Sequence, residues 1–148
     1  MRPRLLPPVY LLLSLISMAV LHRFLPGPQL ADFPARWAGA VVSLASVNFV
    51  VWIAWIFHRA DTTIKPFQES SALLQTGPYR FSRNPIYLGL VGVLLGVAIF
   101  FGSMTPWFVI PFFVAILHFR FVLVEEAMLG RTFGAAYADY RRQVRRWL

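Results

Sequence analysis

Apolar runs alternate with short polar and basic stretches along most of the chain. Two such runs cover residues 8–25 and 37–57. A helix needs about 20 predominantly apolar residues to cross the hydrocarbon core of a bilayer. We therefore predict membrane spans over 8–25 and 37–57. The basic start of the first run also fits a signal peptide, but no small-residue cleavage motif follows it, so we expect this span to be retained.

A third and longer apolar stretch contains two further spans. Between positions 84 and 119 no acidic residue, lysine or arginine occurs. As one helix this stretch would be roughly 54 Å long, too long for a single crossing. The Gly102–Pro106 segment divides it, because glycine ends helices and proline favours their first turn. We predict two antiparallel helices over 85–101 and 106–124, with Gly92 and Gly96 spaced for close helix packing.

The chain becomes polar after the fourth predicted span. From residue 125 onward, large apolar side chains recur every three or four positions, as on one face of an amphipathic helix: they are Phe133, Tyr137, Tyr140, Val144 and Leu148. The prediction is an all-α membrane protein, a single domain over 1–148. It has about four transmembrane helices and a C-terminal amphipathic helix that covers the cytosolic mouth of the last hairpin.

Composition and charge agree with a membrane protein. The chain is 58% hydrophobic and 14% charged, with a net charge of +8, whereas soluble domains carry about 25% charged residues. The basic residues flank apolar runs, which favours contact with lipid headgroups over nucleic acid. They concentrate on one side of the predicted spans. The positive-inside rule therefore places both termini and the 58–84 loop in the cytoplasm, and we expect a bacterial inner-membrane location.

The scarcity of metal ligands limits the possible chemistry. There is no cysteine, and the three histidines, His22, His58 and His118, have no metal-binding spacing. We predict no metal site.

A dense polar and aromatic cluster precedes the third span. Within it, Arg83-Asn84-Pro85 has two interpretations. One is an ordinary helix start, with Asn as the N-cap, Pro in the first turn and Arg83 reaching the headgroups. The other is a pocket at the cytoplasmic rim. There, the free N–H groups of the helix N-terminus would suit a carboxylate or phosphate, and Arg80 and Arg83 would add a carboxylate clamp.

Two adjacent acids, Glu125 and Glu126, follow the last predicted span. They form either a solvated helix end, with one Glu paired to Arg120 or Arg131, or a site for a cationic group. The helix dipole disfavours acids at a helix C-terminus. An ammonium or sulfonium ligand would relieve that cost.

These segments together resemble the isoprenylcysteine carboxyl methyltransferase family, which shares its C-terminal signature with the phospholipid methyltransferases. The resemblance covers roughly residues 60–148. It rests on three blocks in order: Gly77-Pro78-Tyr79-Arg80-x-x-Arg83-Asn84-Pro85-x-Tyr87-x-Gly89, then Glu125-Glu126-x-x-Leu129, then Phe133-Gly134-x-x-Tyr137-x-x-Tyr140 with Val144-x-Arg146.

The resemblance implies an integral-membrane methyltransferase that uses S-adenosyl-L-methionine and acts on a lipophilic or membrane-associated acceptor. It implies that Arg83 and Glu126 carry the catalytic role. The implied cofactor-binding residues are Gly77, Pro78, Tyr79, Arg80, Arg83, Asn84, Pro85, Tyr87, Leu88, Glu125, Glu126, Tyr137 and Tyr140. The prenylcysteine enzymes usually have His at the position of Asn84, and Asn cannot become cationic, so the acceptor is left open.

Two other functions remain open at this point. A membrane reductase of the sterol-reductase type would bind NADPH in its last spans. A small four-span subunit or lipid-binding module would have no catalytic role. Binding of S-adenosylhomocysteine or of NADPH separates the two enzymes.

Overall fold

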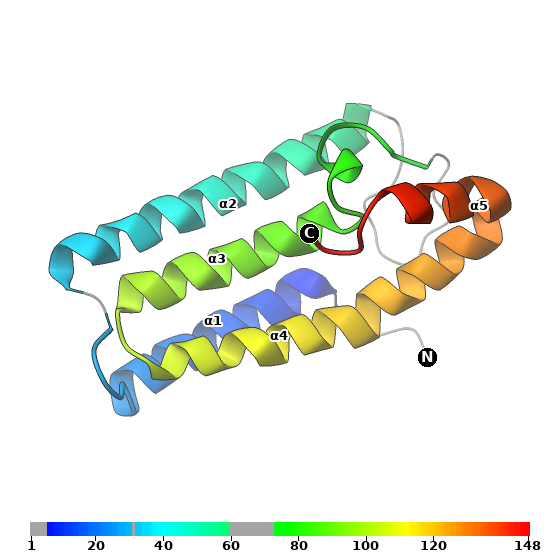
Figure 1. The fold of residues 1–148 in the computed structure, drawn as a ribbon. Coiled ribbons are helices and arrows are strands. Elements are labelled where there is room, and N and C mark those ends of the chain that lie inside the picture. Colours follow the sequence, from blue (N-terminus) through cyan, green and yellow to red (C-terminus); the bar gives the residue numbers. More distant parts are fainter. Residues whose placement is uncertain (1–5, 31, 60–72) are drawn as a thin grey trace.

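The computed structural model describes residues 6–30, 32–59 and 73–148, and within them it is all-α. The helices are α1 (Pro7–Phe24), α2 (Phe33–Arg59), α3 (Pro85–Phe101), α4 (Val109–Leu117) and α5 (Leu123–Gln143). Short 3₁₀ turns, η1 (Gly77–Arg80) and η2 (Thr105–Phe108), precede α3 and α4. Helices α1 to α4 lie lengthwise beside one another (Figure 1). The part of the predicted cofactor region over 60–72 lies outside the described residues.

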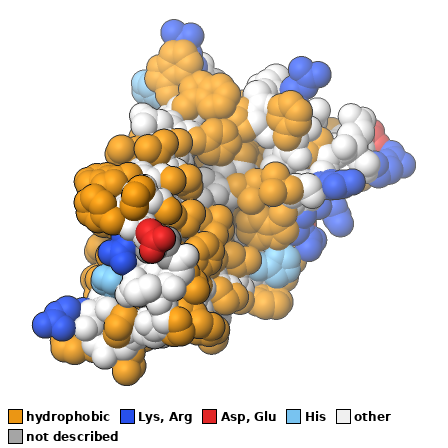
Figure 2. Space-filling view, turned by 60° about the vertical axis from the view of Figure 1, so that its left-hand side comes forward, with side chains coloured by type: hydrophobic (Ala, Val, Ile, Leu, Met, Phe, Trp, Pro, Cys, Tyr) orange, Lys and Arg blue, Asp and Glu red, His pale blue; other side chains and the backbone are white. Residues whose placement is uncertain are grey.

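The outer faces of the helices are apolar. Large hydrophobic side chains are exposed along α1 and α2, among them Leu12, Val41 and Leu44. Figure 2 shows hydrophobic side chains over much of the visible face, with charged ones towards its edges. In the described chain three helices are long and apolar enough to cross a membrane, and α3, of 17 residues, is a shorter apolar helix. This confirms the predicted all-α membrane fold.

The last apolar helix extends further than the sequence pattern suggested. The helical segment extends from Thr105 to Gln143, through a π-helical segment at His118–Val122. The predicted span over 106–124 and the predicted amphipathic helix therefore join without a break at residue 124. The helical segment bends sharply at Gly134, whose φ of 50° and ψ of −118° suit only glycine. In Figure 1 the end of α5 turns back over the start of α3. Helix α2 begins at Phe33, four residues before the predicted second span.

Helices α2 and α3 pack backbone against backbone. A Cβ atom added to Gly96 would lie within 3.0 Å of backbone atoms of Gly39 and Ser43. At Gly92 it would meet the hydroxyl of Ser46. The predicted role of the glycine pair in close helix contact is confirmed. The close packing continues towards the start of α3, where a Cβ atom on Gly89 would meet Val50 and Phe49 of α2.

Candidate functional site

A buried ion pair joins the two residues predicted to be catalytic. Arg83 precedes α3 and Glu126 lies in the first turn of α5, and the return of the chain brings them together. Arg83 Nη1 lies 3.0 Å from Glu126 Oε1, and each side chain is only 9% exposed. Tyr137, beyond the bend in α5, accepts a hydrogen bond from the same Nη1 at 3.5 Å. The two residues therefore contact each other directly.

Glu126 has a second cationic partner that the predicted site did not include. Arg146 donates from Nε to Oε1 at 3.0 Å and from Nη2 to Oε2 at 2.8 Å. These bonds raise the pKa of the Arg146 guanidinium above its ordinary value, so it stays charged. The partners of Glu126 are thus distant in sequence, and neither Arg120 nor Arg131 is among them. The signal available in the sequence was the Val144-x-Arg146 element at the end of the third block.

Glu125 belongs to a separate contact with α3. The Tyr87 hydroxyl donates to Glu125 Oε1 at 2.6 Å. Tyr87 is 6% exposed and its ring packs against Phe121 of the π-helical segment, with centroids 6.3 Å apart. This short hydrogen bond from the packed Tyr87 phenol fixes the Glu125 carboxylate through one of its two oxygens.

The other predicted tyrosines tie the end of α5 to the η1 turn. Tyr140 donates from its hydroxyl to the backbone oxygen of Tyr79 at 2.7 Å. Burial, together with the negative charge of Glu125, raises the pKa of the Tyr79 phenol well above its ordinary value, so this group stays neutral. These contacts hold the returning part of α5 over the residues that precede α3.

Asn84 occupies the N-cap position of α3, but its side chain makes no cap bond. Its Nδ2 instead donates to the backbone oxygen of Arg146 at 2.9 Å, and its backbone N–H donates to Ser82 Oγ at 3.1 Å. The helix-start interpretation therefore accounts for the position of Asn84, but not for the hydrogen bond that its side-chain amide makes. That amide binds the C-terminal tail.

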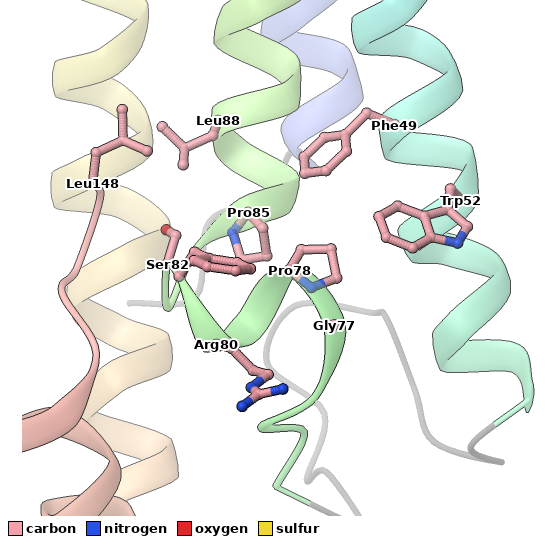
Figure 3. Close-up of a pocket in the computed structure, with 10 residues that line it drawn as sticks. Phe49, Trp52, Gly77, Pro78, Arg80, Ser82, Pro85, Leu88 and Leu148 are labelled. Atoms are coloured by element: carbon pink, nitrogen blue, oxygen red, sulfur yellow. The ribbon is translucent and has the colours of Figure 1, made fainter.

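The remaining predicted residues line a different feature, an apolar groove of about 430 Å³. Figure 3 shows the groove between α2, α3, η1 and the chain end, with the Arg80 side chain extending away from the apolar side chains. Its lining comprises Phe49, Trp52, Gly77, Pro78, Arg80, Phe81, Ser82, Pro85, Leu88 and Leu148. The structure thus divides the predicted site into a polar cluster and an adjoining apolar groove.

One donor in the polar cluster has no acceptor among the described residues. Arg83 Nε is buried and makes no hydrogen bond there, and leaving such a group unsatisfied costs about 1–3 kcal/mol or more. Arg83 and Arg146 also place two positive charges on the single carboxylate of Glu126. An unpartnered donor on a guanidinium suits an anionic group of a ligand. In the described chain no cluster of His, Cys, Asp and Glu could hold a metal ion.

Comparison with known proteins identifies the family. The sequence model described as "Phospholipid methyltransferase" matches residues 34–136, more than half of the chain. The chain belongs to the phospholipid methyltransferase family. This confirms the resemblance and the assignment as an integral-membrane protein with a methyltransferase domain. The match runs from α2 to just beyond the bend at Gly134, so it includes Arg83, Glu125 and Glu126 and ends before Arg146.

Other comparisons are less informative for this member of the phospholipid methyltransferase family. An uncharacterised protein of Haemophilus influenzae is 32% identical over 63 residues, which is 43% of this chain and the whole of that protein. No solved structure matches the chain.

Proposed function

We propose that this protein is an S-adenosyl-L-methionine-dependent membrane methyltransferase acting on a lipophilic or membrane-associated acceptor. The observation that carries the proposal is the buried, unpartnered Nε of Arg83, a residue whose Nη1 is held by Glu126. The cofactor carries a carboxylate, an ammonium and a sulfonium, so the site must offer both cationic donors and a carboxylate. Arg83 and Glu125 supply one of each.

The roles within the site follow from which groups are already engaged. Arg83 binds the cofactor carboxylate through Nε, since its Nη1 is held by Glu126. Glu125, with one oxygen bonded to Tyr87, receives the ammonium on the other. Glu126 orients Arg83. When bound, the cofactor would supply an electrophilic methyl group for transfer to the acceptor. Tyr137, Tyr140 and Tyr79 enclose the site and limit access of water.

A lipophilic acceptor is supported by the apolar groove. The groove is lined in part by the 77–85 segment, which also carries Arg83 of the polar cluster, and its walls are mostly apolar. An apolar chain bound there would place a headgroup beside Arg83 without leaving the membrane interface. The protein would hold the two reactants close together and aligned. In favourable cases this alone lowers the activation barrier by about 7 kcal/mol or more.

The proposed orientation places this site on the cytoplasmic side. Arg59, Arg80 and the tail arginines lie at the site end, whereas Arg23 and Arg36 lie at the other end of the helices. The positive-inside rule then puts both termini in the cytoplasm. A reporter protein that is active only in the cytoplasm should be active when it is fused after Leu148. Activity of a periplasm-specific reporter at that position would contradict the orientation.

Ligand-induced stabilisation tests the cofactor directly. S-adenosylhomocysteine should raise the thermal unfolding temperature of the detergent-solubilised protein, since a ligand that binds only the folded state stabilises it. NADPH should not. The opposite pattern would favour a reductase, and no response to either would favour a non-enzymatic subunit. Transfer of a labelled methyl group to membrane lipid extracts, with mass spectrometry of the product, then identifies the acceptor.

A further inference from the structure

The C-terminal tail is bonded to the residues that precede α3. After α5 ends, the backbone oxygen of Arg145 accepts the N–H of Arg83 at 2.9 Å. The backbone oxygen of Arg146 accepts the amide of Asn84 at 2.9 Å and the hydroxyl of Ser82 at 3.3 Å. Three hydrogen bonds thus attach the tail to residues 82–84. The tail is part of the site's framework, although the family match ends at residue 136.

The Arg146 side chain then closes the cluster from the opposite side. Its planar fork engages both oxygens of Glu126, at 3.0 and 2.8 Å. A two-point contact fixes the plane of a carboxylate, which a single contact cannot do. The side chain of Arg146 is 33% exposed and that of Glu126 is 9% exposed. Arg146 is thus the outer partner of a carboxylate whose inner partner is Arg83.

We propose that Arg146 is a positioning residue for ligand binding. It fixes the carboxylate of Glu126, which in turn fixes the guanidinium of Arg83 and the direction of its unpartnered Nε. This inference rests on the proposed function, in which Arg83 Nε binds the cofactor carboxylate. Without Arg146, Glu126 keeps one oxygen unengaged and can rotate, and Arg83 loses its fixed orientation while keeping its charge.

The test measures ligand affinity by calorimetry on the full-length protein in detergent, with two ligands. S-adenosylhomocysteine has the carboxylate, and its decarboxylated analogue lacks it. Arg146→Ala should weaken S-adenosylhomocysteine binding by about tenfold or more, as for a lost hydrogen bond to a charged group. It should change binding of the decarboxylated analogue by less than about twofold. A merely structural role would weaken both ligands equally.

Arg145→Ala is the matched control, since it removes the same charge from an exposed side chain and keeps the backbone oxygen that accepts the Arg83 N–H. It should bind both ligands as the wild type does. Arg146→Lys keeps the positive charge but loses the two-point contact of the guanidinium with Glu126. The unfolding temperature should therefore be preserved, while S-adenosylhomocysteine binding should weaken by about threefold or more. This variant keeps the test decisive if Arg146→Ala folds poorly.

The failures of the two proposals are distinguishable. If Arg83→Ala loses S-adenosylhomocysteine binding while Arg146→Ala and Arg146→Lys bind it as Arg145→Ala does, the positioning role is wrong and the proposed function stands. If the wild type binds no S-adenosylhomocysteine, both proposals are overturned. If the wild type binds it and Arg83→Ala binds it equally well, the ligand binds elsewhere and the positioning role of Arg146 is wrong.

Discussion

Arg83 Nη1 and Glu126 Oε1 lie 3.0 Å apart in a nearly buried pair, although 43 positions separate the two residues in the chain. Such a pair contributes little net stability compared with apolar side chains, because removing two charges from water is costly. Breaking it by removing one partner is strongly unfavourable. A buried pair with an additional unpartnered donor is consequently better explained by ligand binding than by folding.

The first prediction separates the structural role of Glu126 from the binding role of Arg83. Glu126→Gln leaves the buried Arg83 charge unpaired, and should lower the free energy of unfolding by about 3–5 kcal/mol. Arg83→Ala leaves Glu126 paired with Arg146, so the fold should persist. S-adenosylhomocysteine affinity should nevertheless fall by about 2–5 kcal/mol, roughly 30- to 5000-fold. Thermal unfolding and calorimetry measure the two effects.

Two further variants serve as controls for this prediction. The double variant Arg83→Met with Glu126→Gln removes both charges, and it should be more stable than Glu126→Gln alone while still failing to bind. Arg59 lies outside the cluster, 3.9 Å over the Trp55 ring, and Arg59→Ala should bind normally. Near wild-type affinity in Arg83→Ala would mean that the ligand binds elsewhere.

The second prediction concerns Glu125 and its partner. Glu125→Gln keeps the size of the side chain but loses the charge that receives the ammonium, so S-adenosylhomocysteine affinity should fall at least about tenfold. Tyr87→Phe removes the 2.6 Å hydrogen bond that orients Glu125, and should produce a smaller loss. Calorimetry with an analogue that lacks the amino group supplies the check. Glu125→Gln should bind it as the wild type does, and an equal loss for both ligands would contradict the role.

The third prediction concerns the contact between α2 and α3. Gly96→Ala forces a methyl group against backbone atoms of Gly39 and Ser43, and should lower the free energy of unfolding by about 1–3 kcal/mol. Gly92→Ala meets only side-chain atoms of Ser46 and no backbone atoms, so it should cost less. Gly130→Ala, whose Cβ would lie 3.8 Å from the Tyr137 ring, should be neutral. Thermal unfolding of the three variants checks the order, and equal effects at Gly96 and Gly130 would contradict it.

The bounds of α3, whose start carries Arg83 and Asn84, were predictable from the sequence because helix-start and helix-end signals are local. Asn84-Pro85 and Gly102 begin and end α3 at the predicted residues, and the first two predicted spans agree with α1 and α2 to within a few positions. The grouping of Arg83 with Glu126 came from the family resemblance, whose motifs place both in one site. That they bind each other, with Arg146 as a third partner, could not be read from the pattern.

The sequence predicted a C-terminal helix over the mouth of the last hairpin, but not the bend that turns this helix back. It also did not show that the last span continues into that helix through a π-helical segment. The contact of Arg146 with Glu126 depends on a reversal at one glycine, and a single glycine in an amphipathic pattern does not specify a direction. The separation of the apolar groove from the polar cluster depends on the same reversal.

The fourth prediction tests that reversal. At Gly134 the backbone has φ 50° and ψ −118°, and an added Cβ would meet nothing within 4 Å. The cost of Gly134→Ala is therefore purely conformational, about 1–3 kcal/mol. Because Tyr137, Tyr140 and the tail lie beyond the bend, straightening it would also withdraw the contacts with Arg83 and Tyr79, so S-adenosylhomocysteine affinity should fall together with the unfolding temperature. Gly130→Ala on the same helix should change neither, and wild-type stability and affinity in Gly134→Ala would show that the bend does not hold the site together.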